Sequence, residues 1–257
     1  MVKLLEVAET IEKFVNGNDP DGKPYFPYPM KLEFEKYFKV LFLIKPKMYV
    51  GILCSLRDSK DGKLKKGDPM WDFRNWFVKG VMIIRRDNSD YVRNLFRKVL
   101  ECILTEKTWE ECAYTISDEL QRLDKGQVPE TDLVETRSIG KNYKPTSTYF
   151  MKLAAENMAR LGYPLQAGDR IAYVIVKPAA NAGNKLGYKI RPIEFREQQK
   201  KDGVAEELDL KYYMTNRCQA QIDGLFKTAY GSQTDFLPVR DYIHNGPLPE
   251  GDSDPWE

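Results

Sequence analysis

Histidine and cysteine are scarce in this chain of 257 residues, which contains one histidine and four cysteines. The cysteines are Cys54, Cys102, Cys112 and Cys218, and their spacings match no zinc-binding motif. With His244 as the single histidine, the sequence does not favour a Cys/His zinc site. Buried thiols in a reducing compartment are the simplest interpretation, so we expect an intracellular protein.

Long apolar runs are missing as well. No stretch approaches the ~20 consecutive apolar residues of a transmembrane helix, and the N-terminus lacks the pattern of a secretory signal. The chain also has no glycine-rich phosphate loop and no Ser/His/Asp arrangement. With 42% hydrophobic and 30% charged residues, we expect a soluble globular protein of one large domain or two small ones.

Positive charge is concentrated in two blocks, although the net charge is only +2. Residues 31–100 contain 17 Lys and Arg against 8 Asp and Glu, and residues 137–201 contain 13 against 4, so each block carries +9. Residues 101–136 and 202–257 each carry −7. This alternation predicts one cationic face, whose commonest partner is a phosphate backbone. The alternative is a solvated surface on which the clustering is accidental.

The first third of the sequence predicts a helix followed by strands. Apolar residues at helical spacing predict a helix over residues 3–15. Three segments alternate or are rich in β-forming residues: residues 30–38, residues 40–54 and residues 81–84. Pro46 predicts an edge, a bulge or a break between two strands within the second segment. We interpret residues 57–78 as an irregular loop.

From Asn88 onward the pattern becomes helical. Either Asn88 or Ser89 is expected to cap one helix and Thr108 a second one, which ends before Gly126. Three more elements are expected: a helix over about 146–161, a strand over 170–176 and a helix over about 207–229. The proline-rich tail from Pro238 is expected to be extended or disordered. The predicted fold class is therefore α+β, an antiparallel sheet with a helix followed by a mainly helical domain.

Lys47 and Tyr49 are the first candidates for binding nucleic acid. They alternate on a predicted strand, so both side chains are expected on one face. A lysine on a rigid strand can donate to minor-groove acceptors that every correct base pair presents, and the tyrosine can pack against the sugar–phosphate. A surface lysine beside a half-buried tyrosine on an edge strand is the simpler alternative.

A second group of candidates is Lys79-Gly80 with Arg85-Arg86-Asp87. Gly80 allows the backbone to approach a ligand or another strand closely. We expect residues 81–84 to form a buried strand that delivers both arginines at its end. Because Arg85 and Arg86 then point to opposite faces, one can reach a phosphate while the other pairs with Asp87. An Arg–Asp ion pair with a purely structural role is the alternative.

A third candidate segment runs from Thr136 to Lys144. It combines hydroxyl, amide and ammonium donors with an aromatic ring, which suits a duplex backbone lying across it. Lys141, Tyr143 and Lys144 are the residues we expect to contact phosphates. The alternative is a glycine-containing loop with solvated cations.

In this order, the segments resemble the end of the palm and the thumb of a family B DNA polymerase. The run from Tyr28 to Phe38 resembles the family's Leu-x-x-Glu-Lys strand, and the Lys-x-Tyr, Lys-Gly and Arg-Arg-Asp elements follow. The resemblance covers about residues 1–235 and implies three parts: the C-terminal part of the palm at 1–87, the thumb at 88–237 and a tail at 238–257. Met82 departs from the family, which often has Glu there. Gly168-Asp169-Arg170 resembles a family turn and is given a structural role only.

The resemblance implies a chain that grips primer–template duplex DNA and lacks catalytic residues. Family B enzymes bind Mg²⁺ through two palm aspartates, but no Asp-x-Asp stands here between β-prone runs, and Asp252-Ser253-Asp254 lies in the tail. We therefore expect this chain to bind no cofactor, with Mg²⁺ held by aspartates of a catalytic portion outside it. The predicted DNA contacts are Lys47, Tyr49, Lys79, Gly80, Arg85, Arg86, Lys141, Tyr143 and Lys144.

An open edge of the half-palm sheet implies a partner that carries the catalytic portion. Nucleotidyl transfer is then expected only in complex with that partner, at the site of DNA replication and without a membrane. The chain is expected to be a separate small subunit, a product of a split gene or an excised piece, and its loose thumb resembles a viral enzyme. The alternatives are a stand-alone nucleic-acid-binding module and, less favoured, an RNA-binding scaffold.

Overall fold

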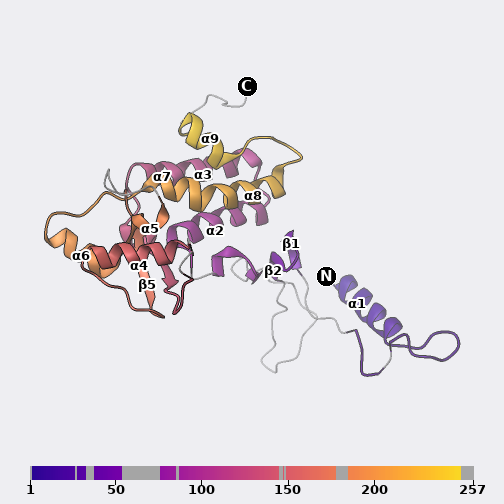
Figure 1. Ribbon diagram of the computed structural model, residues 1–257. Helices are drawn as coiled ribbons and strands as arrows, with labels where there is room; N and C mark the ends of the chain where they lie inside the picture. The colour runs from indigo at the N-terminus through magenta and orange to yellow at the C-terminus, as the bar shows by residue number, and fades with distance from the viewer. Residues whose placement is uncertain are drawn as a thin grey trace, which may run out of the picture. The chain divides into compact units, whose positions relative to one another are not determined.

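The computed structural model describes residues 2–26, 28–32, 38–53, 76–84, 87–144, 147, 149–177 and 185–249 (Figure 1). The chain divides into two compact units, Met1–Gly80 and Val81–Glu257. This division falls a few residues before the boundary expected near residue 87, because the residues just after Gly80 are buried beside the first helix of the second unit. None of the helices in the described segments is long and apolar enough to cross a membrane.

The N-terminal unit begins with the predicted helix, α1 (Val2–Val15). Asn16 fastens the end of this helix to Leu32: its side chain donates to the Leu32 carbonyl oxygen and accepts from the Leu32 N–H, both at 2.6 Å. Phe14 packs against Tyr25 with ring centroids 5.3 Å apart. Even so, Phe14 remains 66% exposed, so the helix keeps part of its apolar face uncovered within its own unit.

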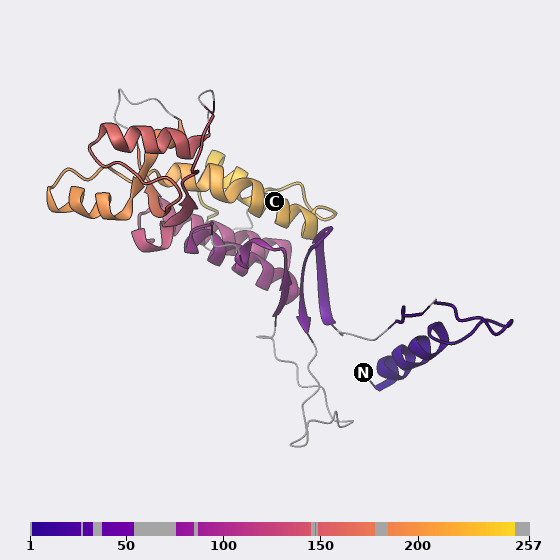
Figure 2. The same ribbon diagram turned by 60° about the horizontal axis from the view of Figure 1, so that its bottom comes forward.

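Three antiparallel strands in the order β1-β2-β3 follow, and Figure 2 shows them side by side. They are β1 (Phe38–Lys45), β2 (Met48–Leu53) and β3 (Trp76–Lys79). Pro46 marks a break between two strands, because β1 and β2 pair through Lys45 and Met48 on either side of a two-residue turn.

The strand expected at residues 30–38 is wrong at its start. Residues 30–32 are not in a strand, residues 33–37 lie outside the described segments, and β1 begins at Phe38. The loop expected at 57–78 is also wrong at its end, since β3 includes residues 76–78; residues 57–75 lie outside the described segments.

The buried strand expected at residues 81–84 is a short 3-10 helix, η1 (Met82–Ile84). Val81, Met82 and Ile83 are buried as the apolar run suggested, at 0%, 5% and 8% exposure. The strand itself ends at Lys79, because Gly80 turns the chain with a φ of +65°. A run of four apolar residues does not distinguish a strand from a helical turn, which explains the error.

The C-terminal unit opens with two helices whose caps were predicted. In α2 (Asp90–Leu104), the Ser89 hydroxyl accepts a hydrogen bond from the Val92 N–H. In α3 (Trp109–Asp124), Thr108 and Glu111 form a reciprocal capping box. The two helices pack along their apolar faces, so local sequence signals are sufficient to define this part of the core.

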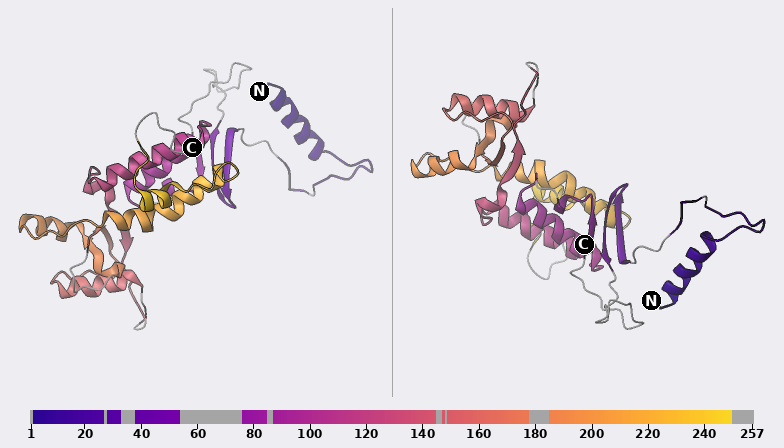
Figure 3. Two further views of the ribbon diagram at one scale, coloured as in Figure 1. Left: turned by 90° about the horizontal axis from the view of Figure 1, so that it is seen from above. Right: turned by 90° about the horizontal axis from the view of Figure 1, so that it is seen from below.

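A second antiparallel sheet has the order β4-β5-β6: β4 (Glu135–Ser138), β5 (Arg170–Ile175) and β6 (Ile190–Pro192). The short helix η2 (Glu130–Leu133) precedes the sheet, and three helices accompany it: α4 (Phe150–Arg160), α5 (Leu186–Lys189) and α6 (Ile193–Lys201). Figure 3 shows these helices with the sheet at one end of the unit and α2, α3 and α8 together at the other. The two antiparallel sheets and the helices around them confirm the predicted α+β fold class.

The expected helix over about 207–229 is present as one helical stretch of three parts. It consists of α7 (Leu210–Tyr212), a π-helical segment, η3 (Tyr213–Gln219), and α8 (Ala220–Tyr230). Tyr213 is fully buried and connects the stretch to the sheet. Its hydroxyl donates to the Leu133 carbonyl oxygen at 2.8 Å and accepts from the Ile175 N–H at 3.1 Å.

The tail expected to be extended or disordered contains a helix, α9 (Pro238–Asn245). Proline stands at the first position of this helix, where it is well tolerated because the missing N–H would have no helical partner. The Asp223 carboxylate accepts from the Val239 and Arg240 N–H groups at 2.9 and 3.1 Å, which caps the helix from outside. Val239 is fully buried, so the prediction is wrong for residues 238–245; residues 246–249 are in neither a helix nor a strand, and residues 250–257 lie outside the described segments.

Candidate nucleic-acid interface

Lys47 lies in the turn between β1 and β2 and not on a strand, so the argument from strand alternation with Tyr49 is wrong. Its φ is +66°, a left-handed conformation that non-glycine residues adopt at a cost. Pro46 before it supplies the restricted φ that suits the first central position of a turn. The turn projects an exposed lysine from the end of the β1–β2 hairpin.

Gly80 approaches this turn closely. A Cβ built on Gly80 would lie 2.3 Å from the Lys47 carbonyl oxygen, so the position has no space for a side chain. Lys79, just before it, pairs in register with Tyr49 across β2 and β3, and the Tyr49 ring stacks on Phe77 with centroids 5.9 Å apart. Four predicted contact residues are thus brought to one corner of the sheet: Lys47, Tyr49, Lys79 and Gly80.

The two lysines of this corner are exposed. Within the described segments, neither Lys47 nor Lys79 forms an ion pair, so both ammonium groups are available to an external anion. Arg85 and Arg86 lie outside those segments. Asp87, which follows them, forms an ion pair with Arg137 near the start of the predicted thumb segment, with Nη2 and Oδ2 3.6 Å apart.

In the second unit, the loop after β4 carries the remaining candidates. The Gly140 N–H donates to the Tyr143 hydroxyl at 2.6 Å, so this tyrosine folds back over its own loop. Its ring also contacts Tyr149, with centroids 6.0 Å apart. Lys141 and Lys144 are exposed on either side of it. Tyr143 therefore shapes the loop, and the two lysines provide its positive charge.

Arg170 belongs to the same region and was missed as a binding candidate. The side chain of Lys141 lies against Gly168, where an added Cβ would be 3.2 Å from Lys141 Cε, and the Ile139 N–H donates to the Asp169 carbonyl oxygen at 2.7 Å. Arg170 pairs with Ser138 at the same end of the β4–β5 ladder and is exposed. The sequence feature that could have indicated Arg170 as a binding residue is its place at the first position of a strand, directly after a turn.

The second basic block is not a continuous cationic surface. Seven of its thirteen cations form ion pairs, three of them with carboxylates from residues 206–209 and two with Glu130. Lys189, Arg191 and Arg196 are buried in these pairs and cannot face nucleic acid. Six cations are exposed and have no ion pair within the described ranges: Lys141, Lys144, Arg160, Arg170, Lys185 and Lys201.

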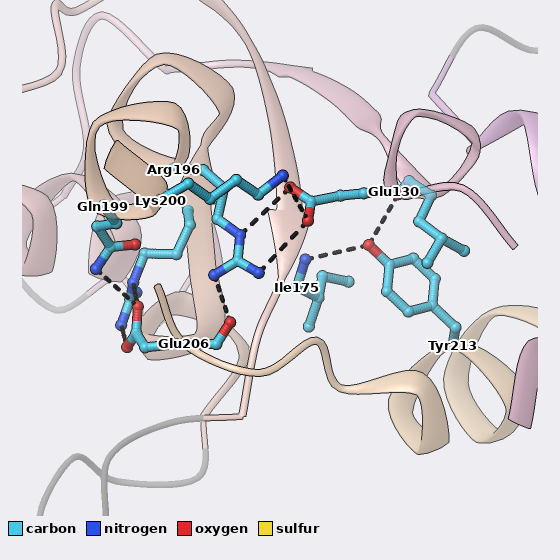
Figure 4. Close-up of polar contacts among 9 residues, drawn as sticks. Glu130, Ile175, Arg196, Gln199, Lys200, Glu206 and Tyr213 are labelled. Carbon is cyan, nitrogen blue, oxygen red and sulfur yellow. Dashed lines mark hydrogen bonds and ion pairs between the residues drawn. The ribbon is translucent and has the colours of Figure 1, made fainter. Parts of the chain in front are cut away.

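Figure 4 shows how one of these buried clusters is held. Arg196 donates to both carboxylate oxygens of Glu130, at 3.3 and 3.4 Å, and to the backbone carbonyl oxygen of Glu206. Arg191 makes a two-bond pair with the Glu206 carboxylate. Burial alone would raise the pKa of Glu206, but the hydrogen bonds and charge of Arg191 hold that pKa below its ordinary value. The cluster fixes the sheet to α6.

A second buried cluster lies between β4, β5 and η3. The Glu135 carboxylate forms an ion pair with Arg217 and accepts from the Tyr173 hydroxyl at 2.9 Å. Burial, then the charge of Glu135, raises the pKa of Tyr173, so the phenol stays protonated and remains a donor. These contacts have a structural role.

Across the described residues, no group of three or more His, Cys, Asp and Glu side chains is placed to hold a metal ion. The tail residues Asp252 and Asp254 lie outside them.

Comparison with known proteins identifies the class of this chain. Residues 1–229 match the family model for DNA polymerase family B. Because the match covers most of the sequence, the chain belongs to this family, as the motifs predicted.

Individual relatives agree with this assignment. The DNA polymerase of Archaeoglobus fulgidus is 27% identical over 198 residues, covering 74% of this chain and 23% of that protein. The DNA polymerase delta catalytic subunit of Candida albicans is 29% identical over 203 residues, covering 78% of this chain and 17% of that protein. The chain thus spans less than a quarter of the length of these relatives.

The solved structure of the family B DNA polymerase from the hyperthermophilic archaeon Pyrobaculum calidifontis is similar in fold. Its TM-score is 0.55 at 18% identity, over 91% of this chain and 25% of that one.

Proposed function

We propose that this chain is the C-terminal palm and thumb portion of a family B DNA-directed DNA polymerase and that it binds primer–template duplex DNA. The observation that carries the proposal is the corner of the first sheet where Lys47, Tyr49, Lys79 and Gly80 meet. In this proposal Met1–Gly80 belongs to the palm, and Val81–Glu257 contains the thumb.

The conformation of Lys47 supports a role beyond folding. A glycine or asparagine would adopt a φ of +66° more easily than lysine does. Backbone strain of this kind is concentrated at functional sites, where a particular side chain is needed. An exposed ammonium group in this turn suits a contact with the minor groove or with a backbone phosphate.

The second unit supplies a separate set of phosphate contacts in this proposal. Lys141, Lys144 and Arg170 are exposed near the end of the β4–β5 ladder, and Tyr143 fixes the loop that carries two of them. Such side chains position a protein on a duplex without reading its sequence, which a polymerase requires. Arg85 and Arg86 remain predicted contacts to the primer strand.

Nucleotidyl transfer is proposed to occur at Mg²⁺-binding aspartates of a catalytic portion outside this chain. In the described part of the first sheet, β1 pairs only with β2, so its other edge is open to a further strand. Leu41 and Leu43 on β1 are 45% and 65% exposed, which also favours cover by a further polypeptide segment. A stand-alone binding module would be expected to have a closed sheet. A split or viral enzyme acting at the site of DNA replication stays a prediction.

The test is a Lys47→Gly variant in the full chain, measured by fluorescence anisotropy with a primer–template duplex. Glycine relieves the backbone strain, so stability should stay equal or rise, while duplex affinity should fall. Glu106→Gly is the matched control, because Glu106 also has a positive φ, +58°, but stands outside the proposed contacts. Unchanged affinity for Lys47→Gly, or an equal loss for Glu106→Gly, contradicts the proposal.

A second experiment tests the catalytic portion. Primer extension by a separately purified catalytic portion should rise on adding this chain, whereas this chain alone should extend no primer. No gain on mixing would contradict the palm and thumb assignment.

A further inference from the structure

Arg137 on β4 connects Asp87 with the loop proposed to bind DNA. Its guanidinium forms the ion pair with Asp87, which directly follows Arg85-Arg86. The same guanidinium lies over the Phe150 ring at the start of α4, with Cζ 5.6 Å from the ring centroid. These two contacts point in different directions along the chain, to residues 50 positions before and 13 positions after Arg137.

From Phe150, a row of aromatic rings leads back to the lysine-bearing loop. Phe150 contacts Tyr149 with centroids 4.8 Å apart, and Tyr149 contacts Tyr143 at 6.0 Å. The Tyr143 hydroxyl then accepts the hydrogen bond from Gly140 that closes the loop around Lys141. Each step is a direct contact, so the path from Asp87 to the loop is unbroken within one compact unit.

The Arg137 side chain is held mainly by these two contacts. Its Nε is buried and has no hydrogen-bond partner among the described residues, and the side chain is 35% exposed. A guanidinium is suited to this position because its planar face packs on a ring while its edge donates to a carboxylate. The ammonium group of a lysine cannot make both contacts in this way.

We infer that Arg137 is a positioning residue that couples Asp87 to the Lys141–Lys144 loop. The effect of this coupling on DNA binding rests on the proposed function. The coupling itself exists in the chain without DNA and does not depend on that function. Arg137 touches no phosphate in this mechanism; it holds the loop that carries Lys141 and Lys144 in a fixed arrangement with Asp87, so that the two lysines are presented to a duplex in one way.

Hydrogen–deuterium exchange of the full chain without DNA tests the coupling. Arg137→Gln should raise exchange at the Gly140 amide about two- to fivefold, because the ring row loses its support. Asp87→Asn is nearly isosteric and should have a smaller effect at the same amide, and the double variant should exchange no faster than Arg137→Gln. Lys177→Gln is the control, since it removes an exposed ion pair of the same unit, with Glu207, and should leave this amide unchanged.

Additive effects of the two substitutions, or no effect of Asp87→Asn at Gly140, would overturn the inference. Arg137→Lys distinguishes charge from geometry, because it keeps the positive charge and loses the planar group over Phe150. Its exchange at the Gly140 amide should be as fast as that of Arg137→Gln. A thermal melt identifies any variant that fails to fold, and Asp87→Asn then still decides the coupling.

The second arm measures duplex affinity. Arg137→Gln and Asp87→Asn should each weaken binding, with no further loss in the double variant. If the unmodified chain binds no duplex, the proposed function fails while the exchange experiment still decides the coupling. If the chain binds duplex but the losses are additive, the inference fails and the proposed function stands.

Discussion

The backbone of Gly80 lies so close to Lys47 that the two residues define one corner of the first sheet. A Cβ at Gly80 would be 2.3 Å from the Lys47 carbonyl oxygen, and the φ of Gly80 is +65°. The turn that carries Lys47 and the end of the strand that carries Lys79 are therefore positioned by a contact that only glycine allows.

Replacing this glycine should destabilise the first unit and displace both lysines. Gly80→Ala is expected to lower the free energy of unfolding of this unit by at least about 2 kcal/mol, through the positive φ and the contact with Lys47 together. Gly22→Ala is the control, because Gly22 has a φ of +79° and nothing within 4 Å of its Cβ position. It should cost about 1 kcal/mol. Hydrogen exchange of the β2 amides measures the loss of stability in both variants. An equal loss in Gly80→Ala and Gly22→Ala would show that the contact between Gly80 and Lys47 is unimportant.

The salt dependence of duplex binding should report the exposed cations of the second unit. Lys141→Gln and Arg170→Gln should each reduce the slope of log affinity against log salt by about one, because each removes one phosphate contact. Lys177→Gln should leave the slope unchanged, since Lys177 is paired with Glu207. If the salt slope of Arg170→Gln equals that of the unmodified chain, Arg170 does not contact the duplex. The slope of Lys141→Gln tests Lys141 independently.

Docking of α9 should depend on the carboxylate of Asp223. Asp223→Ala removes the acceptor for the Val239 and Arg240 N–H groups and should cost about 1–2 kcal/mol. Exchange of the α9 amides should rise before that of α2 or α3. Asp235→Ala, at an exposed position just before the helix, provides the comparison and should have little effect. Protection of α9 that survives in Asp223→Ala would contradict this capping role.

The pairing of Glu206 with Arg191 predicts a loss of stability in acid. Because the pKa of Glu206 in the folded chain lies below its ordinary value of 4.5, the folded state binds this proton less readily than the unfolded state. The pair therefore stabilises the fold above pH 4.5, and this contribution is lost as the pH falls through the lowered pKa. The free energy of unfolding, measured by urea titration between about pH 3 and 7, should depend less on pH in Glu206→Gln than in the unmodified chain. The same pH dependence in both proteins would contradict this prediction.

Local signals in the sequence were sufficient for some elements. The caps at Ser89 and Thr108 were predicted because a capping side chain and the amide it accepts from lie within one helical turn. The break at Pro46 was one of three alternatives, and only the pairing of Lys45 with Met48 decides between them.

Other features depend on contacts between distant residues, which a single sequence does not reveal. Asp223 stabilises the start of α9, where Pro238 is the first helical residue. Because Asp223 lies 15 residues earlier, the sequence around Pro238 does not show that a helix begins there. The charge of the second basic block was misleading for the same reason: Arg196 is neutralised by Glu130, 66 residues earlier in the chain. The place of Lys47 in a turn became clear only from the pairing of Lys45 with Met48 on either side of it.

The wide helical turns of η3 (Tyr213–Gln219) impose a strict length on the chain between two anchors. Tyr213 is held by the second sheet through Ile175 at one end, and Asp223 accepts hydrogen bonds from the start of α9 at the other. In an α-helix each residue turns the side-chain direction by roughly 100°, and in the wider π-helix by somewhat less. Losing or gaining a single residue here would swing the carboxylate away from α9 while the phenol stayed in place, so substitutions should be tolerated in this stretch far better than changes in its length.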